Sequence, residues 1–146
     1  MTSPELERLA EIGALKREPS SRREFEGLVR SARARLKDAA NADLAVESRL
    51  DLAYNASHAL ALAALRRLGY RSDNRFLVFQ ALPHTANLAA SEWRLLGKCH
   101  ERRNLAEYEG LVDLDERLVT DLLRVAEKLL AAVSALPPPA DWARGT

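Results

Sequence analysis

The stretch from Cys99 to Gly110 concentrates the side chains of this chain that are best suited to chemistry. Within one expected helix, Leu96, His100 and Arg103 are separated by four and three residues and therefore share a face. The face that should pack in the core thus changes from apolar to basic along its length. A guanidinium on such a face needs either a carboxylate partner or an anionic ligand.

The basic and amide residues of this stretch are well matched to a phosphate. Arginine supplies a permanently charged planar fork, asparagine supplies both a donor and an acceptor, and a phenol can stack on a base. The residues that could together hold a phosphodiester are Arg102, Arg103, Asn104 and Tyr108. The structural alternative is an arginine near a helix end that pairs with Glu107 or Asp113. Spacing alone leaves both interpretations open.

Other reactive side chains fit the hydrophobic core at least as well as a site. His58 follows Tyr54 by four residues in a helix of alanine and leucine, so it is either a core histidine or a proton-transfer group. Cys99 lies near a helix C-terminus, which disfavours a thiolate, and we interpret it as part of the core. No histidine or cysteine pair has ligand spacing and no glycine-rich phosphate loop occurs, so we expect no metal and no cofactor.

The composition limits the partners that charge alone could attract. Of the 146 residues, 22 are basic and 21 are acidic, so a net charge of +1 gives no overall attraction for nucleic acid or membranes. The single cysteine cannot form an internal disulfide, no apolar run could span a bilayer, and the N-terminus lacks a signal-peptide pattern. We therefore expect a cytoplasmic protein without a membrane partner.

The pattern of elements predicts an all-α fold without strands. Alanine, leucine, arginine and glutamate dominate, and glycines and prolines fall between periodic segments. We expect an up-and-down helical bundle of about four core helices with one or two short accessory helices. One domain should cover residues 1–136, followed by a Pro-rich disordered tail over 137–146. The expected helices cover about 3–16, 20–40, 41–68, 75 onward with a kink or break at Pro83, 92–107, and 113–135.

The third of these helices should lie at the centre of the bundle. The alanines between Tyr54 and Leu65 would let neighbouring helices or a second subunit approach closely, and Gly69 supplies a left-handed C-terminal cap. The expected N-terminal caps are Ser3, Ser20 or Ser21, Asn41 or Asp43, the turn at 71–74, Ser91, and Asp113 or Asp115.

Three segments of the chain resemble the HEPN superfamily. They are residues 54–60 (Tyr-Asn-Ala-Ser-His-Ala-Leu), residues 68–71 (Leu-Gly-Tyr-Arg) and residues 103–108 (Arg-Asn-Leu-Ala-Glu-Tyr). The resemblance covers about residues 41–135 and is closest to small stand-alone bacterial members with an arginine-asparagine, then glutamate-tyrosine signature. It implies an up-and-down helical bundle that forms a homodimer, in which the polar motifs of both subunits meet in one cleft.

The resemblance also implies a class of function. Many HEPN relatives are metal-independent ribonucleases, often toxins paired with a nucleotidyltransferase antitoxin, and others only bind nucleotide or RNA. Arg103 and Asn104 match the first two positions of the ribonuclease motif, whose histidine follows the arginine by about four to six residues. Here Tyr108 and Glu109 stand in that region instead. The residues that could take the role of the motif histidine are His100, His58, His84 and Glu107.

Two functions from different classes follow from these observations. The first is a HEPN-like dimer that binds RNA or nucleotide in a toxin-antitoxin or stress-response setting. If it cleaves RNA, the expected catalytic residues are Arg103, Asn104, Glu107 and Tyr108, with His100 or His58 as further candidates. The alternative is a non-enzymatic helical interaction or dimerisation module that recognises a nucleotidyltransferase or another protein.

Overall fold

The computed structural model describes residues 3–109, 115–140 and 142, with the side chains of 106–109 outside that description. Within these residues the chain forms an all-α bundle, as its sequence predicts. The helices are α1 (Pro4–Glu11), α2 (Arg22–Ala39), α3 (Val46–Arg67), α4 (Arg75–Gln80), α5 (Leu82–Thr85), α6 (Ala90–Glu109) and α7 (Glu116–Ser134).

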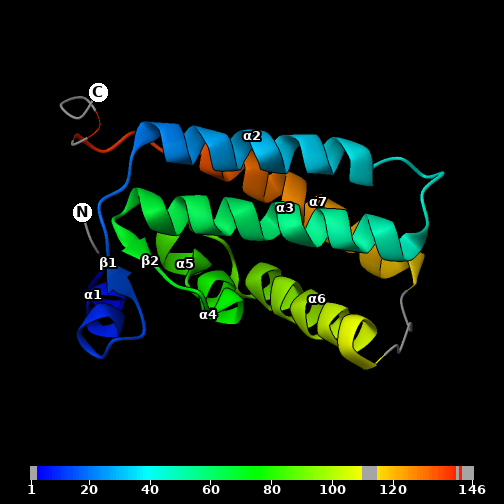
Figure 1. The fold of residues 1–146 in the computed structure, drawn as a ribbon, viewed down its shortest axis with the longest axis horizontal. Coiled ribbons are helices and arrows are strands. Elements are labelled where there is room, and N and C mark those ends of the chain that lie inside the picture. Colours follow the sequence, from blue (N-terminus) through cyan, green and yellow to red (C-terminus); the bar gives the residue numbers. More distant parts are fainter. Residues whose placement is uncertain (1–2, 110–114, 141, 143–146) are drawn as a thin grey trace.

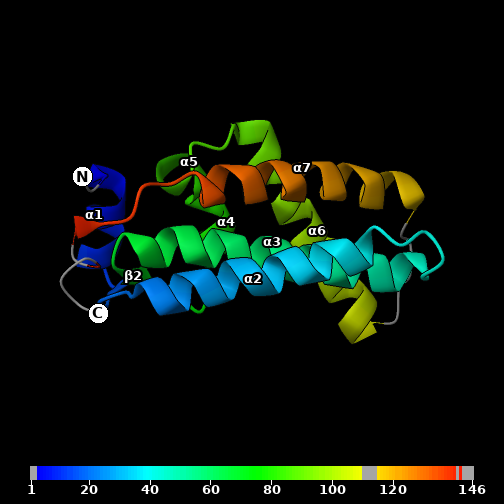
Figure 2. The same cartoon turned by 90° about the horizontal axis from the view of Figure 1, so that it is seen from above.

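Helix α3 lies at the centre of the molecule. The long helices α2 and α7 run beside it, and α4, α5 and α6 cover its remaining side (Figures 1 and 2). Alanines on several faces of α3 are buried, which lets these neighbours approach its backbone closely: Ala53, Ala56, Ala61, Ala63 and Ala64. No helix in the described ranges is long and apolar enough to cross a membrane.

Two left-handed glycines create a short strand pair that the sequence pattern does not predict. Helix α1 ends at Glu11 rather than near residue 16, because Gly13 adopts a φ of 81° just beyond it. Strand β1 (Lys16–Arg17) then pairs antiparallel with β2 (Tyr70–Arg71), which follows Gly69, at a φ of 88°. The expected absence of strands is therefore wrong, since a pairing of two residues is too short to leave an alternating pattern.

Side-chain caps explain most helix starts, and two of the expected ones are wrong. The side chains that accept a backbone N–H at a helix start are Ser3, Ser21, Asn74 and Asp115. Helix α3 begins only at Val46, because the side chain of Asn41 closes a turn before it. Helix α6 begins at Ala90, so Ser91 lies inside its first turn. The helix expected from residue 75 is divided at Ala81, with Pro83 in the first turn of α5, so the expected break near Pro83 is confirmed.

A buried guanidinium holds the N-terminal segment against the end of α3. The side chain of Arg66 is only 3% exposed, and it donates to the backbone carbonyls of Glu18, Pro19 and Tyr70 at 2.9, 2.6 and 3.2 Å. Its Nε donates to the carboxylate of Glu24 at 3.0 Å. Because Arg66 is nearly sealed from water, its guanidinium depends on these four acceptors to satisfy its charge and its N–H groups.

The segment that follows α7 also contacts this end of the bundle. Trp142 is 5% exposed, its ring centroid lies 5.3 Å from that of Phe25, and its indole N–H donates to Ser20 Oγ at 3.1 Å. Within the expected disordered tail at 137–146, this residue therefore packs on α2. Residues 141 and 143–146 of that tail lie outside the described residues.

We expect Arg66→Met to lower the free energy of unfolding by about 3 kcal/mol, because it leaves buried carbonyls and a carboxylate without their donor. The matched variant is Arg71→Met. Arg71 pairs with Glu18 and Glu24 but is 34% exposed, so its loss should cost about 1 kcal/mol or less. Urea unfolding measures both, and equal losses would show that burial does not distinguish the two arginines.

Candidate functional site

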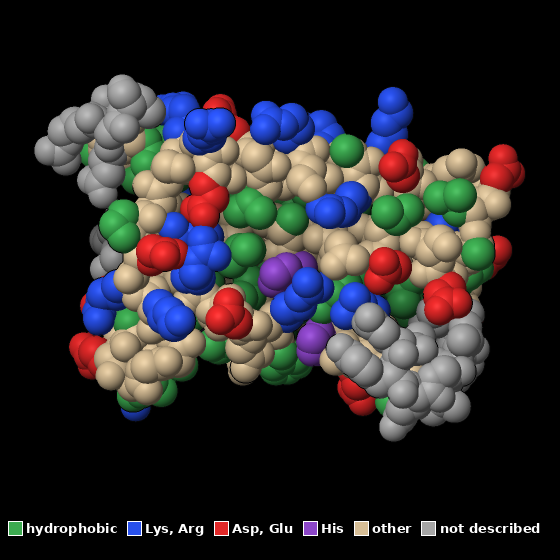
Figure 3. Space-filling view, viewed as in Figure 1, with side chains coloured by type: hydrophobic (Ala, Val, Ile, Leu, Met, Phe, Trp, Pro, Cys, Tyr) green, Lys and Arg blue, Asp and Glu red, His purple; other side chains and the backbone are tan. Residues whose placement is uncertain are grey.

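Helices α3, α4 and α6 bring five polar side chains together, which we call the α3–α6 cluster: Tyr54, Arg75, His100, Arg103 and Asn104. Tyr54 comes from the middle of α3, Arg75 from the first turn of α4, and the other three from successive turns of α6. Figure 3 shows histidine and Lys or Arg side chains gathered at the middle of the face where α3 lies above α6. Three of the sequence-predicted site residues, His100, Arg103 and Asn104, therefore meet in space.

A hydrogen-bonded chain runs through the centre of the α3–α6 cluster. The hydroxyl of Tyr54, a residue without exposed surface, lies 2.7 Å from Nδ1 of His100, and the two rings stack with centroids 5.9 Å apart. On the other side of the imidazole, Nδ2 of Asn104 lies 3.3 Å from Nε2. With Asn104 donating to Nε2, the imidazole proton is on Nδ1 and the hydroxyl oxygen of Tyr54 accepts it. Both ring nitrogens of His100 are thereby fixed.

Two arginines flank the ring of Tyr54. The guanidinium carbons of Arg75 and Arg103 lie 5.6 and 5.3 Å from its centroid, within cation-π distance. Arg75 donates to the amide oxygen of Asn55 at 3.1 Å, and Nε of Arg103 lies 3.4 Å from the carboxylate of Asp51. The cluster therefore holds two permanent positive charges beside His100, which favours an anionic ligand.

The surroundings keep both nearby imidazoles neutral. Burial, followed by the charges of Arg75 and Arg103, lowers the pKa of His100. Burial, followed by the charges of Arg75 and His100, lowers the pKa of His58 to about 4. Nε2 of His58 has no hydrogen-bond partner among the described residues. His100 is therefore neutral, and it can accept a proton at Nε2 when Asn104 no longer donates to that nitrogen. The ring of His58 packs against Phe79.

The remaining sequence-predicted residues separate into three groups. Arg102 is half-buried on α6 next to the cluster, whereas His84 lies on α5 with its Nδ1 3.8 Å from Glu5. The side chains of Glu107 and Tyr108 lie outside the described residues, as does Asp113. Arg103 pairs with Asp51, whereas the structural interpretation of the sequence named only Glu107 or Asp113 as its partner.

Cys99 is a core residue, as its place in the sequence indicates. Its side chain is fully buried, and burial raises the pKa of its thiol to about 12. A thiol with such a pKa is protonated at neutral pH and is not a nucleophile. In the described part of the chain, no three His, Cys, Asp or Glu side chains come close enough to hold a metal ion.

Sequence reasoning missed Arg75, Asn55 and Asp51 as neighbours of the cluster. Asn55 stands inside the motif that resembles HEPN proteins, but Arg75 belongs to a different helix and carries no signal beyond its place after the capping residue Asn74. Its role depends on where α4 crosses α3, which no local pattern specifies.

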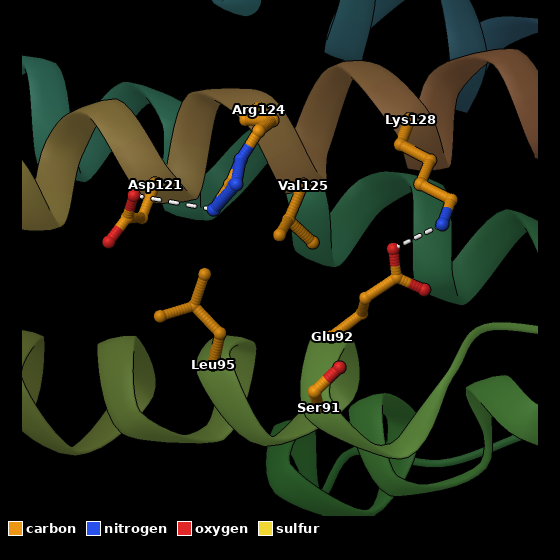
Figure 4. Close-up of a pocket in the computed structure, with 7 residues that line it drawn as sticks. All are labelled: Ser91, Glu92, Leu95, Asp121, Arg124, Val125 and Lys128. Atoms are coloured by element: carbon orange, nitrogen blue, oxygen red, sulfur yellow. Dashed lines mark hydrogen bonds and ion pairs between the residues drawn. The ribbon is translucent and has the colours of Figure 1, made fainter.

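A separate groove of about 530 Å³ lies between α6 and α7. Figure 4 shows Leu95 and Val125 facing each other across it, with an ion pair at either end. Nζ of Lys128 lies 2.5 Å from the carboxylate of Glu92, and Arg124 lies 3.3 Å from Asp121. Among the described residues, both cations of the groove contact a carboxylate, whereas in the α3–α6 cluster only Arg103 does and Arg75 contacts a neutral amide, so the cluster offers an anion more positive charge.

No protein-family model matches this sequence, and no curated protein is significantly similar to it. Function must therefore be argued from the geometry of the α3–α6 cluster and from the resemblance seen in the sequence motifs.

The depressed pKa of His58 makes the stability of the protein sensitive to acid. Protonation of His58 is disfavoured in the folded state, so the free energy of unfolding should fall as pH drops from about 6.5 toward 4, by up to about 3 kcal/mol. We expect His58→Leu to remove most of this dependence, because leucine does not titrate and suits an apolar site. His84→Leu is the control, since His84 is partly exposed and should leave the dependence unchanged. Urea unfolding between pH 7 and 4 tests this, and unchanged acid sensitivity in His58→Leu would refute it.

Proposed function

We propose that this protein is HEPN-like and binds RNA or a nucleotide through the α3–α6 cluster, which holds the phosphate. The observation that carries the proposal is the neutral His100, held between Tyr54 and Asn104 with two guanidiniums within cation-π distance of the Tyr54 ring. Arginine is suited to phosphate because its planar fork can donate to two oxygens at once.

The same cluster supports metal-independent cleavage of RNA as part of the proposal. Cleavage needs a base to take the 2′-hydroxyl proton and positive charge to stabilise the phosphorane that forms. His100 is a neutral imidazole, and its Nε2 can serve as that base once the bound RNA displaces the amide of Asn104 from it, in the role of the motif histidine. Arg103, with Arg75, supplies the positive charge, and Asn104 orients the imidazole.

The biological setting in the proposal rests on the resemblance alone. HEPN relatives form dimers in which two polar motifs share a cleft, and many act as toxins beside a nucleotidyltransferase antitoxin. We therefore propose a homodimer in a toxin-antitoxin or stress-response setting, with a nucleotidyltransferase as the partner protein.

A second candidate function is a non-enzymatic interaction module. The observation in its favour is that Arg103 contacts Asp51 and Arg75 contacts Asn55, so both arginines have structural partners inside the subunit. In this case the α3–α6 cluster would fix the helices or a partner protein rather than bind a phosphate.

We expect purified protein to bind labelled single-stranded RNA without metal, and Arg103→Ala to weaken that binding roughly 10- to 100-fold, as loss of a charged hydrogen bond does. Arg33→Ala is the matched control, because it removes one exposed positive charge from α2. Fluorescence anisotropy in the presence of a chelator measures both.

The same samples decide between binding and catalysis. Cleavage by the wild type that is lost in His100→Asn, with binding retained, would identify His100 as the base. Binding without cleavage would leave the RNA-binding proposal and remove the ribonuclease. No binding by the wild type would favour the interaction module.

A further inference from the structure

An exposed aromatic ring lies beside the α3–α6 cluster. Phe76 is 41% exposed, and the other exposed large hydrophobic residues within the described ranges are Ile12 at 72% and Leu44 at 37%. Its ring centroid lies 6.0 Å from that of Trp93 and 6.4 Å from that of His100. A single exposed apolar ring is ordinary on a protein surface, so what distinguishes Phe76 is its position beside the two guanidiniums and the imidazole of the α3–α6 cluster.

A glycine in the interior of α6 makes room for this ring. A Cβ added at Gly97 would lie 3.0 Å from Cε2 of Phe76, a tight contact that the ring could relieve only by shifting a few tenths of an ångström. Glycine in a helix interior costs about 1 kcal/mol relative to alanine. Helix α6 therefore carries a helix-destabilising residue at the position where one edge of the Phe76 ring approaches its backbone. That edge contacts the helix, and 41% of the Phe76 surface remains exposed.

The charges next to Phe76 fit a nucleic-acid backbone. Arg75 precedes it in α4, and the contacts of its guanidinium in the described part of the chain are to the neutral amide of Asn55 and the ring of Tyr54. Arg103 lies over the same Tyr54 ring. A solvent-exposed aromatic ring beside paired guanidiniums is the arrangement by which proteins bind unpaired bases together with their phosphates.

We propose that Phe76 is a stacking surface for one unpaired base of single-stranded RNA, whose adjacent phosphate is held by Arg75 and Arg103. This inference rests on the proposed function and narrows its substrate class to single-stranded RNA. A phenyl ring has no donor or acceptor, so the contact is tolerant of base identity. A base inside a duplex is already stacked, so duplex RNA does not use this surface.

The test compares an eight-nucleotide single-stranded RNA with an abasic strand of the same backbone length, by fluorescence anisotropy in a chelator. Phe76→Ala should weaken binding of the base-containing strand roughly 5- to 150-fold, the loss expected for one stacked base, and leave the abasic strand unchanged. Phe76→Trp keeps an aromatic face and should bind as the wild type does. Phe76→Leu keeps the apolar contact with Trp93 without the aromatic face and should weaken binding as alanine does.

Two further variants separate stacking from general exposure and from folding. Gly97→Ala requires the Phe76 ring to shift by a few tenths of an ångström and should weaken binding of the base-containing strand, while the helix preference of alanine offsets the crowding in the free energy of unfolding. Ile12→Ala removes an exposed hydrophobic residue that follows α1 and should leave binding unchanged.

The result that would overturn the stacking surface at Phe76 differs from the result that would overturn the proposed binding of RNA. RNA binding that depends on Arg103 but is unaffected by Phe76→Ala would overturn the stacking surface alone. An equal loss for both strands in Phe76→Ala would also overturn it, since the ring would then act on the phosphate site. Absence of binding to either strand by the wild type would overturn the proposed function itself.

Discussion

The close packing of α3 against every other long helix is the constraint on which this structure depends. Small side chains let its neighbours approach, so the few long polar residues on α3 must have their tips satisfied by those neighbours. Tyr54 reaches His100 on α6, and Arg66 reaches the carbonyls and carboxylate of residues 18–24. Both the proposed site and the anchoring of the N-terminal segment thus follow from one buried helix.

Much of the fold could be predicted from the sequence, because its signals are local. The caps at Ser21, Asn74 and Asp115 and the break at Pro83 depend only on adjacent residues, and the structure confirms them. The pairing of β1 with β2 could not be predicted, since it joins residues more than fifty positions apart through two hydrogen-bonded residues each. Gly13 was the available signal for the early end of α1.

Part of the candidate site also follows from local sequence patterns, and part depends on residues that are distant in the sequence. Helical spacing placed His100 and Arg103 on one face of α6, and Asn104 follows one turn after His100. The neighbours Arg75 and Asp51 could not be predicted, because they depend on how α4 and α3 cross α6. The neutral state of His100 is likewise a consequence of its assembled surroundings, namely burial and two nearby guanidiniums.

The contacts of Arg66 also bear on the order in which the chain can become ordered. Three of its four acceptors lie 42 to 48 residues earlier in the sequence, so residues 18–24 are synthesised before their donor. Until the last turn of α3 exists, this segment has no guanidinium to bind, and ordering it against Arg66 closes a long loop. The contacts of residues 18–24 with Arg66 therefore complete only after α3 has been synthesised to its last turn.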